Sequence, residues 1–154
     1  MPLNKIVVSL LMLFLFISGE TKSQLSGTKT IGSSGSDYAS IKDAVDDLNA
    51  NGISASVKFV INSGTYEGDF TIDDILRTSD SDTIVFTSAT EDSTDVIIKN
   101  NPSDTVNFLV KLNGCKHVTF KKITFKTLSV PFVKQILLTN GASYNRFQNC
   151  VFNA

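Results

Sequence analysis

The chain has 154 residues, of which 42% are hydrophobic and 19% are charged, and its formal net charge at pH 7 is −1. A chain of this length forms at most one domain with a modest hydrophobic core. Its basic residues are scattered among acidic ones and form no stripe, which argues against nucleic acid as a partner.

Residues 1–23 have the pattern of a signal peptide. Lys5 supplies the positive charge, and residues 6–17 (IVVSLLMLFLFI) form an apolar run. This run is shorter than the about 20 residues of a membrane span, which favours a cleaved signal over an uncleaved anchor. We predict cleavage after Ser23, with Gly19 as the alternative site. The mature chain is then secreted or held at the cell surface, with no membrane contact of its own.

Residues 24–36 are predicted to be a lead-in segment that ends in a glycine-serine run, Gly32–Ser36. Glycine-rich loops before helices can bind phosphate, but that function needs a strand–loop–Lys pattern that is missing here. We therefore interpret the run as a connecting loop and predict no cofactor.

Residues 37–154 are predicted to form one domain that starts with a short helix over 40–50. Ser40 suits the N-cap, and Asp43 stands where it completes a capping box. One face of this helix is apolar, formed by Ile41, Ala44, Val45 and Leu48. Asn51-Gly52 supplies the end. A single helix of this length is not stable alone, so we expect it to pack on an apolar surface.

Short β-strands follow the helix. Apolar residues alternate with other residues from Val57 to Ile61, a turn is indicated at Asn62–Gly64, and a second strand pattern runs from Tyr66 to Ile72. Further β-branched runs occupy Thr83–Phe86 and Val96–Ile98, separated by a polar loop. The pattern predicts a domain of strands and turns behind one helix.

The two stretches TIGSSGSDYASIKDAVDDL and VKFVINSGTYEGDFTI resemble the start of right-handed parallel β-helix domains of the pectin-lyase-like class. They are most similar to the N-terminal portion of secreted β-helix proteins of Bacteroidetes-type bacteria, and the resemblance covers about residues 28–154. It implies an all-β solenoid of about three to four rungs, closed at its N-terminal end by the helix. Pectin methylesterases of this class carry catalytic Asp and Gln residues on later rungs, so the resemblance implies the fold and not the activity.

The last third of the chain repeats with a period of 27 residues. The matched positions are Asn113 and Asn140, Gly114 and Gly141, Phe120 and Phe147, and Phe125 and Phe152. A fixed period of this size is typical of a solenoid. We expect aromatic rings to stack on aromatic rings along the axis, and the two asparagines to form a short amide ladder.

The same alignment places the two cysteines at different points of the rung. Cys115 aligns with Ala142 and Cys150 with Ile123, so we predict two buried free thiols and no disulfide. A disulfide would require a different register.

No catalytic, cofactor-binding or metal-binding residue is assigned from the sequence. His117 is the only histidine, and with no cysteine, carboxylate or serine fixed beside it we interpret it as a surface rung residue. Oxygen ligands for calcium are clustered at Asp73, Asp74, Asp80, Ser81 and Asp82, but without a ligand spacing. A solvated acidic loop is therefore the favoured interpretation.

Sugar sites use aromatic platforms, and this chain has no Trp. Tyr38, Tyr66 and Tyr144 are the rings that we expect to be exposed, which makes a weak case for a glycan site. The first functional hypothesis is an exported, non-catalytic module that binds polysaccharide or cell-surface glycan, or that has a surface-structural, adhesin-like role. The alternative is the N-terminal part of a polysaccharide lyase or carbohydrate esterase whose catalytic rungs lie beyond Ala154. Because Val151–Ala154 falls within a rung, we also predict self-association through an open last rung.

Overall fold

The computed structural model describes residues 23–32, 34–100, 106–127 and 133–154. The predicted signal peptide lies outside these residues except for Ser23. No helix in the described ranges is long and apolar enough to cross a membrane.

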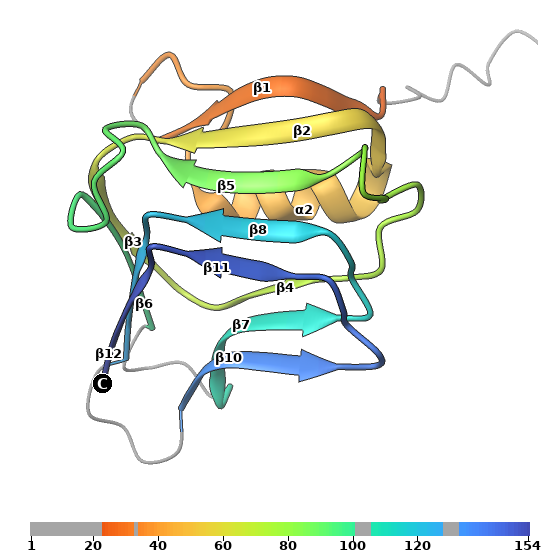
Figure 1. Cartoon of the computed structure of the whole chain (residues 1–154). Helices are drawn as coiled ribbons and strands as arrows, with labels where there is room; N and C mark the ends of the chain where they lie inside the picture. Colours follow the sequence, from red (N-terminus) through yellow and green to blue (C-terminus); the bar gives the residue numbers. More distant parts are fainter. Residues whose placement is uncertain (1–22, 33, 101–105, 128–132) are drawn as a thin grey trace, which may run out of the picture.

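Twelve strands form three parallel sheets in the described residues (Figure 1). Sheet 1 has the order β1-β2-β5-β8-β11, with β1 at Leu25–Ile31, β2 at Ile53–Ile61, β5 at Ile84–Ser88, β8 at Val118–Lys121 and β11 at Arg146–Gln148. Sheet 2 has the order β3-β6-β9-β12, with strands at Gly64–Glu67, Val96–Lys99, Thr124–Lys126 and Val151–Asn153. Sheet 3 has the order β4-β7-β10, with strands at Phe70–Ile72, Phe108–Asn113 and Lys134–Thr139.

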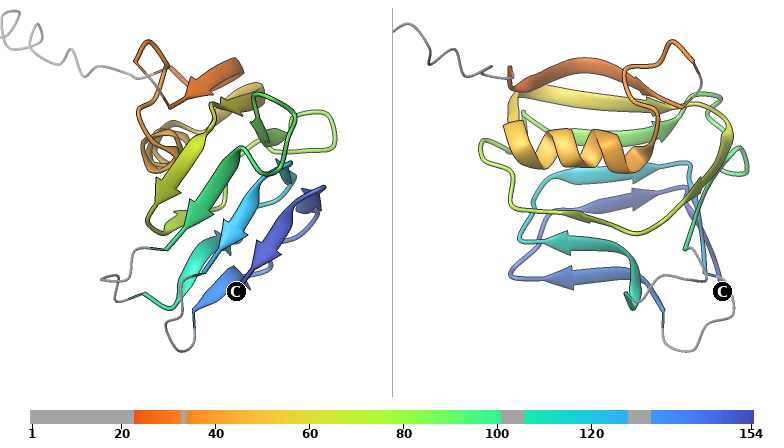
Figure 2. Two further views of the ribbon diagram at one scale, coloured as in Figure 1. Left: turned by 90° about the vertical axis from the view of Figure 1, so that its left-hand side faces the viewer. Right: turned by 180° about the vertical axis from the view of Figure 1, so that it is seen from behind.

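The chain visits the three sheets in turn, so each circuit is one rung of a right-handed parallel β-helix (Figure 2). The described rungs are β2-β3-β4, β5-β6-β7 and β8-β9-β10, followed by β11 and β12 of a further rung. This confirms the predicted fold and its three to four rungs. Parallel strands need a crossover to return to the same sheet, and here the crossover strands belong to the other two sheets.

Helix α2, Ile41–Asn51, is the predicted capping helix. The Asp43 backbone N–H donates to Ser40 Oγ at 3.1 Å and the Ser40 backbone N–H donates to Asp43 Oδ2 at 3.0 Å, which confirms the capping box. All four residues of the predicted apolar face are buried, and α2 contacts β1 and β4. Gly52 ends the helix at φ 65° and ψ −162°, a positive φ as expected but outside the left-handed helical region that the sequence predicted.

Stacked phenylalanine rings run through the core inside sheet 1. Phe59 lies 4.6 Å from Phe86, Phe86 lies 5.2 Å from Phe120, and Phe120 lies 5.4 Å from Phe147, each between ring centroids. A second stack joins Phe125 to Phe152 at 5.2 Å. Such pairs each contribute about 0.5–1.5 kcal/mol beyond their burial. The predicted stacking of aromatic on aromatic is confirmed.

The 27-residue register also holds where the sequence showed it. Phe147 pairs with Phe120 and Phe152 with Phe125. Earlier rungs are longer, because Phe86 pairs with Phe120 across the loop that follows β5. Strand β1 lies in the segment for which the sequence predicted only a lead-in, and it pairs with β2 over most of its length.

Both cysteines are free, as predicted. Cys115 is fully buried, and this burial raises the pKa of its thiol to about 12. Cys150 is half-buried rather than buried, because it lies on the last described rung, where fewer side chains cover it. Burial raises the pKa of the Cys150 thiol as well.

Candidate functional site

A shallow polar hollow of about 50 Å³ lies at one margin of sheet 1, where the connections from sheet 3 enter it. The chain reaches the hollow three times, once per rung, just before β5, β8 and β11. The lining side chains are Asp80, Thr83, His117, Thr119, Tyr144 and Arg146. Residues that lie far apart in the sequence meet here because successive rungs stack in register.

Thr119 and Arg146 occupy paired positions on neighbouring strands of sheet 1. The next residues, Phe120 and Phe147, pack into the core. Side chains alternate along a strand, so Thr119 and Arg146 point to the outer face of the sheet. Arg146 is exposed, and its guanidinium is free to recognise a planar anion.

His117 and Tyr144 precede β8 and β11 at equivalent positions, as the sequence alignment predicted. Their rings stack at 5.1 Å with 4° between their planes. Both backbones have a positive φ, 56° for His117 and 57° for Tyr144. For residues other than glycine this conformation costs on the order of 1–3 kcal/mol, so the surrounding turns must hold it in place.

The structure corrects the interpretation of His117 as a lone surface residue. Its Nδ1 lies 3.3 Å from Asp80 Oδ1, and its side chain is only 15% exposed, whereas that of Asp80 is 98% exposed. Sequence reasoning missed this pair because Asp80 belongs to the connection between β4 and β5, which has no counterpart in the repeat. Only the stacking of rungs brings the carboxylate to the imidazole.

Of the three rings expected to be exposed, only Tyr144 is, at 72%. Tyr38 is half-buried, packs against Phe59 and donates its hydroxyl to Asp47 Oδ2 at 2.6 Å. Tyr66 is also half-buried, and its hydroxyl donates to the Asn62 carbonyl oxygen at 2.8 Å. Burial raises the pKa of both hydroxyls. These two rings serve the core, which leaves Tyr144 as the exposed tyrosine platform in the described residues.

The predicted asparagine ladder is present and extends by one acidic residue. Asn140 Nδ2 donates to Asn113 Oδ1 at 2.6 Å, and Asn113 Nδ2 donates to Asp73 Oδ1 at 2.7 Å. Asp73 is therefore part of a rung-to-rung ladder, and Asp80 pairs with His117. In the described part of the chain no group of three or more His, Cys, Asp or Glu residues is placed to hold a metal ion. The calcium alternative has no donor set there.

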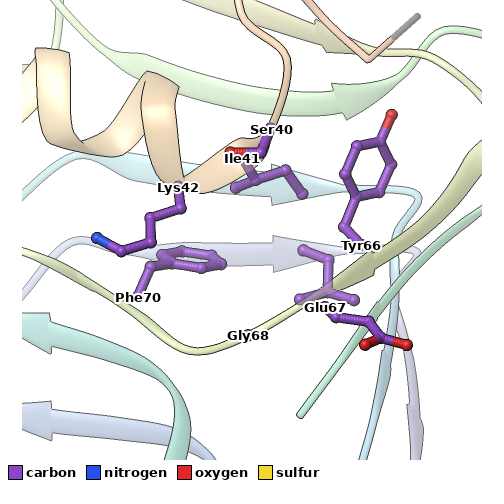
Figure 3. A pocket seen from close by; sticks show the side chains of 8 residues that line it. Ser40, Ile41, Lys42, Tyr66, Glu67, Gly68 and Phe70 are labelled. Atoms are coloured by element: carbon purple, nitrogen blue, oxygen red, sulfur yellow. The ribbon is translucent and has the colours of Figure 1, made fainter. Parts of the chain in front are cut away.

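A second cavity, of about 40 Å³, lies between the start of α2 and the β3–β4 connection (Figure 3). Its polar groups already have partners, because Ser40 belongs to the capping box and Glu67 pairs with Lys99 at 2.6 Å. A space of this size holds no more than a few water molecules. We therefore treat the hollow around Tyr144 as the candidate site.

Comparison with known proteins identifies the fold. Two crystal structures of pectin methylesterase from Aspergillus niger, both deglycosylated forms, superpose with TM-scores of 0.58 and 0.57 at 23% and 21% sequence identity. The chain shares its fold with them. In each case 84% of this chain matches 44% of the enzyme, so the chain spans less than half the length of these structures. No protein-family model matches the sequence, and a search of curated proteins found no match.

Proposed function

We propose that this chain is the front part of an exported β-helix protein that binds an acidic, pectin-like polysaccharide at the hollow around Tyr144 and Arg146. The observation that carries the proposal is the exposed Tyr144 ring, held rigidly on His117 beside the exposed Arg146. The likeness to pectin methylesterase supports the choice of polymer. Export rests on the signal-peptide pattern, and the bacterial source remains a prediction.

The chemistry of the hollow suits one sugar of an extended polymer. One face of the Tyr144 ring is covered by His117, and the exposed remainder can pack against the C–H face of a pyranose. Arg146 can bind a uronate carboxylate through two parallel N–H donors. Enclosing pockets usually measure about 300–1,000 Å³, so a hollow of about 50 Å³ holds a polymer at the surface without enclosing it.

Binding to polygalacturonate, measured by affinity electrophoresis and calorimetry, tests this function. We expect Tyr144→Ala and Arg146→Gln each to weaken binding by about tenfold, the effect of losing roughly 1.4 kcal/mol. Added salt should weaken wild-type binding and affect the Arg146→Gln variant less, because salt screens an exposed charge pair.

The exposed Arg77 provides a matched control, because it lies outside the hollow. Arg77→Gln should bind as the wild type does, and a neutral galactan should bind weakly to all variants. Equal affinities for wild type, Tyr144→Ala and Arg146→Gln would remove the hollow as the binding site.

The second candidate is a carbohydrate esterase, favoured by the match to pectin methylesterase over 84% of the chain. For a protein of residues 24–154 we expect no methanol release from methyl-esterified pectin. Within the described residues His117 pairs with Asp80, and no hydrogen bond joins it to a hydroxyl that would serve as nucleophile. Methanol release that is lost in His117→Ala would instead make the hollow an active site. Release only by a longer natural chain would support the esterase with catalytic rungs beyond Ala154.

A further inference from the structure

The largest of the described cavities, about 230 Å³, lies at the N-terminal end of the β-helix, away from the hollow around Tyr144. Three segments meet there: the residue before β1, the last turn of α2, and the connection that follows β4. Figure 1 shows these segments together at the right-hand side of the molecule. The lining residues are Gln24, Asn49, Ala50, Asn51, Gly52, Asp74, Ile75 and Leu76.

This cavity is electronegative. Helix α2 ends in it, and carbonyl groups at a helix C-terminus carry a partial negative charge. The last turn of α2 contains no basic residue that would offset this charge. Asp74 adds a carboxylate, and none of the lining side chains is basic. A cation placed here would be stabilised from two sides.

Gln24 is the residue whose backbone reaches the cavity from the N-terminal side. The next residue, Leu25, is held by two contacts: its N–H donates to the Gly52 carbonyl oxygen at 2.9 Å, and it pairs with Ile53 of β2. The backbone nitrogen of Gln24 is therefore kept within one residue of the end of α2. In the uncleaved chain that nitrogen is a neutral amide.

We propose that signal-peptide cleavage after Ser23 turns this nitrogen into an α-ammonium group that binds in the cavity, against the C-terminal end of α2 and Asp74. Processing thereby completes the N-terminal cap of the solenoid. The mature protein gains a positive charge at the helix end where its sequence provides none. Favourable charges at helix ends typically change an unfolding equilibrium constant about two- to fivefold.

The same contact protects the new terminus chemically. An N-terminal glutamine cyclises when its neutral α-amine attacks the side-chain amide carbon, forming an N–C bond, and the amide nitrogen leaves as ammonia. The reaction needs an unprotonated amine. Asp74 and the helix end favour the protonated form, so the docked terminus should cyclise slowly. Cyclisation would remove the charge on which the cap depends.

The mass of the exported mature protein is the first test. We expect a chain that begins at Gln24, and a chain that begins at Glu20, the product of cleavage after Gly19, would overturn the proposal. The second test compares urea unfolding of the mature protein with and without N-terminal acetylation. Acetylation should lower the unfolding midpoint in the wild type and in the control Asp69→Asn, which alters a carboxylate outside the cavity.

Asp74→Asn separates the charge contact from a steric effect of the acetyl group. In this variant acetylation should change the midpoint much less, and loss of ammonia, followed by intact-mass spectrometry, should become faster than in Asp69→Asn. Equal midpoints for free and acetylated wild-type protein would contradict the docked ammonium. An unchanged effect of acetylation in Asp74→Asn would contradict the role of Asp74.

Discussion

At the scale of single residues, the neighbours of a side chain in this protein are set by the rung above and the rung below. His117 stacks on Tyr144 of the next rung and pairs with Asp80 of the previous connection. Asn113 likewise bridges Asp73 and Asn140. Each of these contacts joins three rungs, so a substitution at the middle position removes two interactions rather than one.

Cys115 gives a pH-dependent prediction at this scale. Burial raises the pKa of its thiol to about 12 from an ordinary value of 9.0. The folded protein then holds this proton more tightly than the unfolded chain does. The resulting stability is fully present below about pH 9 and is lost as the pH rises towards about 12.

Urea unfolding of the wild type and Cys115→Ala across this pH range measures the effect. We expect the difference in free energy of unfolding between the two proteins to shrink as the pH rises. Asp46→Asn, at an exposed acidic position, should show a constant difference over the same range. Parallel curves for wild type and Cys115→Ala would show that the thiol does not titrate in this way.

At the scale of elements, local signals account for α2 but not for β1. The capping box, the apolar face and the glycine end of α2 are all written in adjacent residues, and all are present. In β1 only Leu25 and Ile31 are buried, so no alternation of apolar residues marks it as a strand. It becomes one because β2 offers a complete partner edge, and tertiary pairing outweighs local propensity.

The packing of α2 on the β-helix predicts a large effect for Leu48→Ala. Leu48 is fully buried on the helix face that contacts β1 and β4. Removing its side chain leaves a cavity and should lower the free energy of unfolding by about 2–4 kcal/mol. Lys42→Ala changes an exposed ion pair on the opposite face and should cost no more than about 0.5 kcal/mol. Equal melting of Leu48→Ala and wild type would show that α2 does not pack on the first rung.

At the scale of the whole molecule, the fold could be predicted from the sequence and the candidate site only in part. The period of 27 residues in the last rungs predicted the ring stacks, the asparagine ladder and the alignment of His117 with Tyr144. The irregular connections between rungs hid the rest. Asp80 lies in such a connection, so no sequence spacing relates it to His117. Exposure of Tyr144 alone among the tyrosines depends on the hydrogen bonds of Tyr38 and Tyr66, which join distant or bent segments.

The last described rung predicts self-association of a protein made as residues 24–154. Leu138 and Phe152 stand at positions that are buried on earlier rungs, yet they are 53% and 46% exposed here. Strands β10, β11 and β12 also form the outer edges of their sheets. Apolar side chains beside unpaired strand edges favour pairing with another chain. We expect dimers or larger assemblies whose fraction grows with concentration in size-exclusion chromatography with light scattering.

A lysine on the exposed edge tests whether this rung is the contact surface. Phe152→Lys should shift the protein towards monomer, because a charge beside the strand edge opposes pairing. Ser54→Lys places the same charge on an exposed residue of β2, away from the last rung, and should leave the assembly unchanged. If both variants associate as the wild type does, the contact lies elsewhere on the molecule. A monomeric wild type with a cooperative melt at every concentration would mean that the exposed rung is stable in water without a partner.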